Sequence, residues 1–244
     1  MENIKGKLIV FDGLDGTGKQ TQSTLLYDYL NHKNIKCKRI AFPVYESPSG
    51  RIVRQYLKGE LNLDKKIYDN KFNDRYRKAL LYAQDRYINL LKQDENNKSL
   101  MDYYNEGYII ICDRYVSSNY LFMTHGMVNY EYDKFVKTIN MIEYELIGIP
   151  KPDLSFFLEM TPEKSLECIN KRGEEKDIHE TEDILKEAYN SLILYKNYIK
   201  RNKTNNTAYI NKTIFINCID DSNSLRTIDN IHNEILSIIK SEIL

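Results

Sequence analysis

The sequence has neither an excess of one charge nor a long apolar run. Its 244 residues contain 35 Lys and Arg against 35 Asp and Glu. The chain therefore lacks the basic surplus with which proteins neutralise the phosphates of a nucleic-acid polymer, and we expect no such partner. No segment approaches the run of about 18 apolar residues that spans a bilayer, and the first residues do not resemble a signal peptide. We therefore expect no membrane partner.

Cysteine is also scarce, with 4 residues that lie far apart and lack the spacing of a metal site. Cys37, Cys112 and Cys218 lie in or beside apolar, β-rich runs, which indicates buried thiols. Because unpaired buried thiols are typical of a reducing compartment, the sequence predicts a cytoplasmic protein.

Continuous apolar runs alternate with stretches of helical periodicity along the whole chain. The runs typical of buried strands are Lys7–Phe11, Ile35–Phe42, Tyr108–Tyr115, Asp153–Met160 and Thr213–Cys218. The stretches typical of helices are Gly18–His32, Pro48–Leu57, Tyr68–Leu91, Ser117–Met123, Tyr132–Ile147, Pro162–Lys171, Ile184–Arg201 and Ser224–Ile243. Because the strands are apolar throughout, both faces of their sheet should be covered. The sequence therefore predicts an α/β fold with a five-stranded parallel sheet and helices on both faces, in a single domain spanning 1–244.

The segment VFDGLDGTGKQTQ (Val10–Gln22) joins the first predicted strand to the first predicted helix. It contains the pattern Gly-x-x-x-x-Gly-Lys, in which glycines let successive backbone N–H groups point at an anion. The helix N-terminus adds partial positive charge, and Lys19 is placed to bridge the β- and γ-phosphates of a nucleotide. The strand before the pattern and the helix after it make this interpretation specific. The predicted ATP- and phosphate-binding residues are Gly13, Asp15, Gly16, Thr17, Gly18, Lys19, Gln20 and Thr21.

Gln20 stands where such loops usually carry a Ser or Thr whose hydroxyl coordinates Mg²⁺. Mg²⁺ keeps several waters and often takes only one or two protein ligands. Loss of the hydroxyl should therefore weaken the placement of the metal without abolishing nucleotide binding. We expect a working loop whose Mg²⁺ is held by waters, phosphates and a carboxylate elsewhere, with Thr21 near the α-phosphate.

Charged residues of both signs stand at the carboxyl ends of two predicted strands. Asp15 lies inside the loop, where a carboxylate can accept a hydrogen bond from a sugar hydroxyl or hold a metal ion. Asp113 and Arg114 follow the third strand, at the sheet edge where ligands of such folds bind. This adjacent acid and base suggests metal and phosphate chemistry; an exposed ion pair in a turn is the alternative. Asp113 and Asp15 are the candidate metal ligands.

Five ordered motifs, which cover nearly the whole chain, resemble the thymidylate kinase family. They are GLDGTGKQTQ (Gly13–Gln22), FPVYESPSGRIVRQYLKGE (Phe42–Glu60), LLYAQDRY (Leu80–Tyr87), DRYVSSNY (Asp113–Tyr120) and KPDLSFFLEMTPE (Lys151–Glu163). The resemblance implies a P-loop NTPase fold and transfer of the γ-phosphate of ATP to dTMP, in dTTP biosynthesis, with Mg²⁺ as cofactor. It also implies a homodimer, for which the helices around Phe72–Leu91 and Ser117–Met123 would supply apolar faces.

The resemblance assigns roles to residues of the acceptor site. Asp15 would contact the 3′-hydroxyl, and Arg114 would hold the acceptor phosphate. Tyr82 would stack on the base and Arg86 would hydrogen-bond a base carbonyl. On the residues alone, Tyr82 fits a helical core stripe and Arg86 a solvated face.

The remaining acceptor residues come from two other motifs. Ser118 would line the base pocket, and Phe122 would press on the sugar and disfavour a 2′-hydroxyl. Phe42, which opens the second motif, joins this substrate-binding set. By its spacing alone, Phe122 also fits a helical core stripe.

The charged stretch KRGEEKDIHETED is the predicted lid, over about 171–182. Relatives with an Arg beside the loop aspartate bring positive charge to the migrating phosphoryl group from the loop itself, whereas this chain has Gly16 there. The resemblance then implies that the lid supplies this charge, with Arg172 as the best candidate and Lys171 and Lys176 as support. A solvated charged loop is the alternative. The predicted catalytic residues are Lys19, Arg114, Arg172 and Asp15.

Three departures from the family pattern bear on base preference and lid chemistry. Tyr45 stands where relatives have an Arg, Met123 where many have a Gln, and the lid carries Asp177-Ile178-His179-Glu180 in place of Asp-Arg-x-Glu. The alternatives are a kinase for another deoxynucleoside monophosphate or a nucleoside, and a nucleotide-binding regulator without turnover. An acceptor that already carries a phosphate needs Arg114, whereas a nucleoside acceptor needs a general base beside its 5′-hydroxyl.

Overall fold

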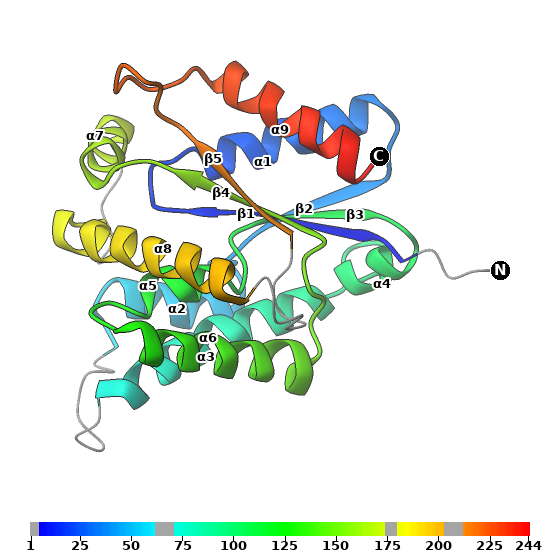
Figure 1. The fold of residues 1–244 in the computed structure, drawn as a ribbon. Coiled ribbons are helices and arrows are strands. Elements are labelled where there is room, and N and C mark those ends of the chain that lie inside the picture. The colour runs from blue at the N-terminus through cyan, green and yellow to red at the C-terminus, as the bar shows by residue number, and fades with distance from the viewer. Residues whose placement is uncertain (1–4, 62–70, 174–179, 203–211) are drawn as a thin grey trace.

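The computed structural model describes residues 5–61, 71–173, 180–202 and 212–244. Within these residues, five strands form one parallel sheet in the order β2-β3-β1-β4-β5 (Figure 1). The strands are β1 (Lys7–Gly13), β2 (Cys37–Ala41), β3 (Ile109–Asp113), β4 (Leu154–Glu159) and β5 (Lys212–Asn217). The predicted parallel sheet is confirmed, and each predicted strand coincides with an observed one apart from its terminal residues.

The strands are apolar at consecutive positions because both faces of the sheet are buried. In β1, Leu8 and Val10 pack into one core cluster, whereas Ile9 and Phe11 pack into the other. All four side chains have no exposed surface. This alternation within one strand explains why its sequence reads as a continuous apolar run.

Helices cover both faces of the sheet, and capping residues set the starts of several of them. The helices are α1 (Lys19–His32), α2 (Pro48–Leu57), α3 (Lys71–Leu91), α4 (Leu100–Asn105), α5 (Ser118–Phe122), α6 (Asn129–Asn140), η1 (Met141–Ile147), α7 (Pro162–Arg172), α8 (Glu182–Asn202) and α9 (Ile228–Glu242). Figure 1 shows α1 and α9 on one face and α3, α5, α6 and α8 on the other. None of the described helices is both long enough and apolar enough to cross a membrane.

Among the differences from the predicted helices, two have a capping residue as their cause. The closing helix starts at Ile228 rather than Ser224, because the Thr227 hydroxyl accepts the backbone N–H of Asn230. α4 was not predicted. Its signal is the capping box of Ser99, whose hydroxyl accepts the backbone N–H of Asp102 while the Asp102 carboxylate accepts the backbone N–H of Ser99.

The helix predicted over Tyr132–Ile147 is two elements in succession. α6 ends at Asn140 and continues directly into η1, a π-helix that ends at Gly148 in the left-handed region. π-helical turns occur mostly as single wide turns and often at functional sites. This one places Glu143 in the core, with 1% of its surface exposed.

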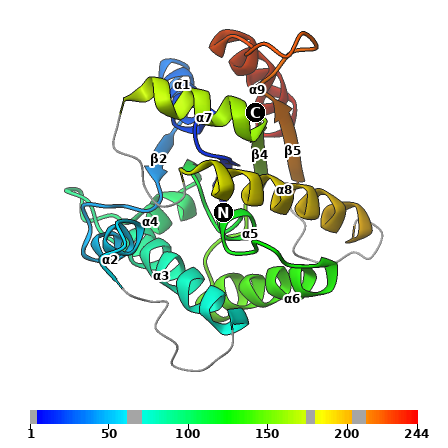
Figure 2. The same cartoon turned by 90° about the vertical axis from the view of Figure 1, so that its left-hand side faces the viewer.

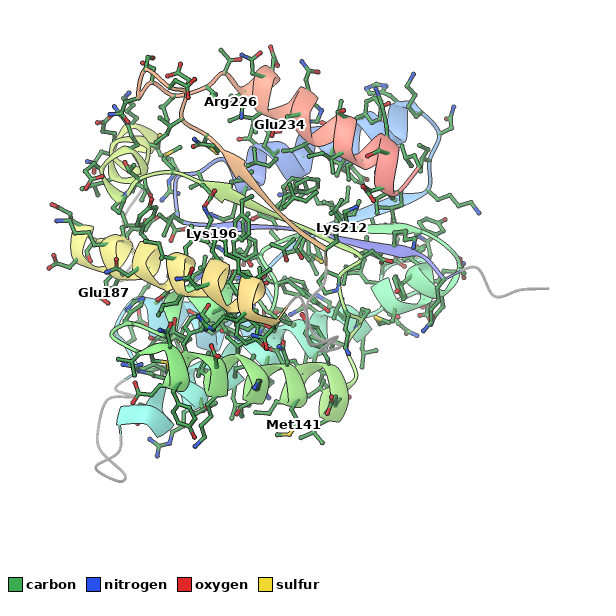
Figure 3. The ribbon with its side chains drawn as sticks, viewed as in Figure 1. Met141, Glu187, Lys196, Lys212, Arg226 and Glu234 are labelled. Atoms are coloured by element: carbon green, nitrogen blue, oxygen red, sulfur yellow. The ribbon has the colours of Figure 1, made fainter. Side chains whose placement is uncertain are left out.

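The layers bring the carboxyl ends of the strands together at one side of the molecule. Figure 2 views this side and shows α5 centrally, with α8 above it and α3 and α6 below. α8 is tied to the sheet by an ion pair between Lys196, labelled in Figure 3, and Glu159 at the end of β4. The loops that follow β1, β2 and β3 all open at this edge, where ligands of open parallel sheets bind.

Candidate active site

The loop between β1 and α1 has the conformation of an anion-binding turn. Gly16 and Gly18 have φ values of 75° and 86°, and α1 begins at Lys19 directly after Gly18. Positive φ is accessible to glycine without strain, which explains the glycines at these positions. The loop therefore presents its backbone at the N-terminus of a 14-residue helix, as the sequence predicts.

Lys19 is held inside this loop with 6% of its surface exposed. Its Nζ donates a hydrogen bond of 2.5 Å to the carbonyl oxygen of Leu14. Burial and the nearby Arg114 guanidinium lower the pKa of Lys19 to about 8. A lysine held in this way is placed to meet a phosphate oxygen, because a nearby anion favours the charged form of the lysine.

Asp15 and Arg114 form an ion pair between the loop and the end of β3. Arg114 has a φ of 66°, and its backbone N–H donates to the carbonyl oxygen of Phe11 at 2.8 Å. Burial opposes its charge, but Asp15 and Asp12 more than offset this, so the pKa of Arg114 is raised. The guanidinium also lies over the ring of Phe122, 5.2 Å from its centroid. Arg114 is therefore a fixed cation that is present at every physiological pH.

Asp113 is the buried carboxylate of this edge, with 8% of its surface exposed. Burial raises its pKa, although Lys19, Arg114 and Arg39 pull the other way. Arg39 of β2 lies 3.3 Å from the Asp113 carboxylate and also donates to the hydroxyl of Ser23. Asp113 thus lines the cleft among cations that favour its ionised form, the form that can bind a metal ion.

Two adjoining hollows meet at this edge. The larger cleft is lined by Asp15, Gly16, Gly18, Lys19, Gln20, Thr21, Ala41, Phe42, Pro43, Tyr45, Arg54, Leu57, Lys58, Asp113, Arg114, Cys168, Arg172 and Glu180. The smaller pocket is lined by Asp15, Phe42, Pro43, Tyr45, Leu57, Tyr82, Arg86, Arg114, Tyr115, Ser118, Asn119, Phe122 and Met123. Asp15 and Arg114 line both, so their ion pair stands on the border between the two.

Most of the predicted nucleotide-binding residues line the larger cleft. Gly13 and Thr17 do not. Gly13 lies at the end of β1, where an added Cβ would meet the carbonyl oxygen of Leu158 at 2.4 Å. Thr17 is buried and donates its hydroxyl to the carbonyl oxygen of Leu14 at 2.8 Å. These two residues therefore support the conformation of the loop and do not line the cleft.

All the predicted substrate-binding residues line the smaller pocket. Tyr82 and Phe122 therefore belong to a pocket wall rather than only to a core stripe. Arg86 is 2% exposed, so the alternative of a solvated face is wrong. Ser118 lines the pocket while its hydroxyl donates to the buried carboxylate of Asp12 at 2.7 Å.

The structure adds polar residues to this pocket that were not predicted. Asn119 lines it directly, whereas Glu143 lies behind it and contacts Arg86. Asp85 accepts hydrogen bonds from the Val44 backbone and from the hydroxyl of Ser49, and so fixes the loop after β2 against α3. In the sequence, such residues could be recognised as charged or amide side chains at helical positions where the surrounding pattern predicts an apolar one.

Helix α7 explains why the loop carries Gly16 and no arginine. A Cβ on Gly16 would come within 2.7 Å of the carbonyl oxygen of Ser165 and 3.1 Å of the Ile169 side chain. The Ser165 hydroxyl also donates to the carbonyl oxygen of Asp15. The loop is therefore packed against α7, and no side chain fits at position 16 without displacing the helix.

The same helix brings the first residues of the predicted lid to the larger cleft. Arg172, in the last turn of α7, lines the cleft and forms an ion pair of 2.6 Å with Glu180. The interior of the predicted lid, with Lys176, Asp177, Ile178 and His179, lies outside the described residues. Arg172 therefore lies at the edge of the larger cleft, and its predicted role as the cation at the transferring group stays a prediction.

Comparisons with known proteins agree with one another. The family model described as thymidylate kinase matches residues 11–214. Thymidylate kinase of Plasmodium falciparum is 30% identical over 95% of this chain and 89% of its own. Probable thymidylate kinase of Methanocaldococcus jannaschii is 28% identical over 98% of both chains. The solved thymidylate kinase of Candida albicans is similar in fold, with a TM-score of 0.62 at 23% identity over 97% of this chain and 92% of its own.

Proposed function

Because the chain belongs to the thymidylate kinase family, we propose that it transfers the γ-phosphate of ATP to dTMP and yields dTDP and ADP. The observation that carries this proposal is the place of Asp15 and Arg114 on the border between a phosphate cleft and a second, more enclosed pocket. A phosphoryl-transfer enzyme needs two sites that meet at the migrating group, with fixed positive charge between them.

Each cation of the site has a separate task in this reaction. Lys19 and the backbone N–H groups of the loop hold the phosphates of ATP. Arg114 holds the phosphate of the acceptor once that phosphate replaces Asp15 as its partner, and Asp15 is then free to accept a hydrogen bond from the 3′-hydroxyl. Arg172 approaches from α7 and stabilises charge on the transferring group. Catalysis is positioning and electrostatic stabilisation, without a covalent intermediate.

The donor set of the cleft fits a Mg²⁺ ion that is held mainly by phosphates and waters. Among the described residues, no group of three or more His, Cys, Asp or Glu side chains is arranged to hold a metal. Asp113 and Asp15 both line the larger cleft, and each is paired with an arginine, Asp113 with Arg39 and Asp15 with Arg114. One carboxylate is enough, since Mg²⁺ at nucleotide sites is commonly bound through one or two. When bound, the ion neutralises charge on the phosphates, and Asp113 would hold it.

The acceptor pocket supports a nucleoside monophosphate over the alternatives. Arg114 lines this pocket and stays positively charged, as an acceptor phosphate requires. Tyr82 and Phe122 supply aromatic walls for a base and a sugar. A regulator without turnover would not need Arg172 in the nucleotide cleft. The proposal is tested by coupled measurement of ADP formation with dTMP, other nucleoside monophosphates and thymidine. It expects the highest kcat/KM for dTMP; a higher value for thymidine would contradict it.

Replacing Gln20 with threonine should lower the Mg²⁺ concentration needed for half-maximal rate. A threonine hydroxyl at this position adds one oxygen ligand to an ion otherwise held by phosphates, waters and Asp113. Asp113→Asn should raise the Mg²⁺ requirement, because it removes negative charge near the ion. Mg²⁺ titrations of the wild type and both variants measure these shifts. Loss of activity in Gln20→Thr that excess Mg²⁺ does not rescue would show that Gln20 makes a needed contact of its own.

We also propose a homodimer, for which α3 supplies the apolar face. Leu80, Tyr87, Ile88 and Leu91 share one side of this helix and are 44, 44, 37 and 47% exposed. The second face predicted, Ser117–Met123, is wrong, because its apolar side chains are buried within the chain. Met141, at 42% exposure, lies at the lower margin of the molecule in Figure 3 and is a further apolar contact.

The dimer proposal predicts twice the mass of one chain by light scattering at micromolar concentration. Ile88→Lys should shift the protein to monomer, because it places a charge on the apolar face. The exposed Ile193 of α8, at 45%, offers a matched control, and Ile193→Lys should leave the mass unchanged. A monomeric wild type would contradict the proposal.

The cysteines support a cytoplasmic location, which we propose together with this function. All four are free; Cys37, Cys112 and Cys218 are buried as predicted, and Cys168 is partly exposed. Burial raises the pKa of the Cys37 thiol to about 11, which disfavours the reactive thiolate at neutral pH.

A further inference from the structure

The acceptor pocket has a buried ion pair in its wall that no step above uses. Arg86, 2% exposed, donates from Nε to Oε2 of Glu143 at 2.7 Å and from Nη2 to Oε1 at 2.5 Å. Burial opposes the charge on Arg86, and Glu143 more than offsets this, so the pKa of Arg86 is raised. A buried pair of this kind is weak evidence for stability, because an apolar pair of similar volume is often as stable. Its place beside the pocket points to recognition instead.

Glu143 fixes which atoms of Arg86 remain for a ligand. Two of the three guanidinium nitrogens donate to the carboxylate. The third, Nη1, donates a hydrogen bond of 3.4 Å to the carbonyl oxygen of Tyr115 and keeps a second hydrogen. Nη1 carries two hydrogens and accepts nothing. Arg86 therefore offers the pocket a hydrogen-bond donor in a fixed position.

Glu143 also sets the orientation of Asn119, which lines the same pocket. The Asn119 amide nitrogen donates to Oε1 of Glu143 at 3.2 Å. An ionised carboxylate only accepts hydrogen bonds, so Asn119 must turn its Nδ2 toward Glu143. Its carbonyl oxygen is then the atom that Asn119 offers the pocket, where it is an acceptor.

The wall thus presents a donor from Arg86 beside an acceptor from Asn119. Thymine and uracil carry a carbonyl oxygen at C4 and a hydrogen on N3, which match this order. Cytosine carries an amino group at C4 and an N3 without a hydrogen, so its donor and acceptor stand in the opposite order. Binding of cytosine would therefore leave buried polar groups of the pocket and of the base without hydrogen-bond partners.

The carboxylate lies on a buried stripe that runs from α6 into η1. In α6 the buried positions Tyr132, Phe135, Val136 and Ile139 form an apolar stripe. Glu143 continues this stripe into the π-helix and is the charged residue on it. The stripe therefore directs a single carboxylate at α3 and α5, which carry Arg86 and Asn119.

Resting on the function proposed above, we propose that Glu143 is a positioning residue for base recognition. Its carboxylate holds Arg86 as donor and Asn119 as acceptor, and so selects a base with a C4 carbonyl and an N3 hydrogen against cytosine. Glu143 itself does not touch the nucleotide.

The test is Glu143→Gln, assayed with saturating ATP against dTMP and dCMP. A glutamine can donate as well as accept, so Asn119 can turn its own donor to the pocket. The ratio of kcat/KM for dTMP to that for dCMP should fall at least about tenfold, since hydrogen-bonded sites discriminate strongly through such mispairing. Most of the change should appear in the KM for dTMP, because base contacts act in ground and transition states alike. The KM for ATP should stay near the wild-type value.

Tyr120→Phe is the matched control. It removes another buried hydrogen bond between α5 and α6, from Tyr120 to Asn140, without touching the Glu143 carboxylate. It should lower the melting temperature and keep the dTMP preference. Glu143→Gln with an unchanged ratio, or Tyr120→Phe with an equal loss of preference, would overturn the proposal.

If Glu143→Gln does not fold, Asn119→Leu tests the same contact while leaving the ion pair of Arg86 intact. It should also lower the preference for dTMP over dCMP about tenfold, and an unchanged preference would overturn the proposal. A wild type that accepts dCMP as well as dTMP overturns it too. A wild type that phosphorylates neither refutes the proposed function itself, which distinguishes the two failures.

Discussion

Lys19→Ala is expected to lower kcat/KM for ATP by about 10³-fold or more, the scale seen when a charged group is lost from a phosphate site. Lys19 lies within the loop, almost fully buried, with Nζ turned to the loop carbonyl of Leu14. We expect Lys19 to contact the phosphates in the ground state and more strongly in the transition state, where charge builds up on the transferring group, so the KM for ATP should rise and kcat should also fall. Steady-state kinetics with varied ATP measures both constants.

The pH dependence of ATP binding gives this prediction a second readout. The ordinary pKa of lysine is 10.5, and burial lowers that of Lys19 to about 8 in the free protein. Below pH 8 Lys19 is charged and binds phosphate; as the pH rises through 8 it loses its proton, and affinity for ATP should fall. The affinity of Lys19→Ala should lack this step. A wild-type affinity that is flat from pH 7 to 9.5 would contradict the assigned role.

Arg172→Ala is expected to lower kcat by about 10²-fold or more with little change in either KM. Gly16 leaves the loop without an arginine, and α7 blocks any side chain there, so the cation must come from elsewhere. Arg172 lines the nucleotide cleft from the end of that helix. We expect Arg172 to exchange its contact with Glu180 for a contact with the transferring phosphoryl group. That second contact exists only during the reaction.

Lys164→Ala is the matched control for Arg172. Lys164 belongs to the same helix and pairs with Glu167 at the surface, away from the cleft. Its loss should leave kcat near the wild-type value. If Arg172→Ala also keeps near-normal kcat, the cation at the migrating group is supplied by another residue and the assignment of Arg172 is wrong.

The sequence was enough to predict the sheet and the phosphate loop because both depend on local patterns. Continuous apolar runs identify strands buried on both faces, and the glycines before Lys19 identify a turn that only glycine adopts easily. The pocket residues Tyr82, Ser118 and Phe122 came from the resemblance to a family. Their spacing alone could not separate a pocket wall from a helical core stripe.

The polar layer behind the pocket could not be predicted, because it depends on contacts between distant elements. Arg86 and Glu143 are 57 residues apart, and their pairing depends on how the fold brings α3 and η1 together. A signal was present nonetheless. Glu143 follows the apolar positions Tyr132, Phe135, Val136 and Ile139 at helical spacing, and a charged residue on such a stripe is buried only with a partner.

The most direct test of phosphoryl transfer from ATP to dTMP follows the phosphate itself. Purified protein is incubated with Mg²⁺, dTMP and ATP labelled on the γ-phosphate, and the products are separated by chromatography. The account predicts that the label appears in dTDP at the rate at which ADP forms, and that Lys19→Ala abolishes both. Label released as inorganic phosphate, or no label transferred to dTMP while ATP binds normally, would contradict it.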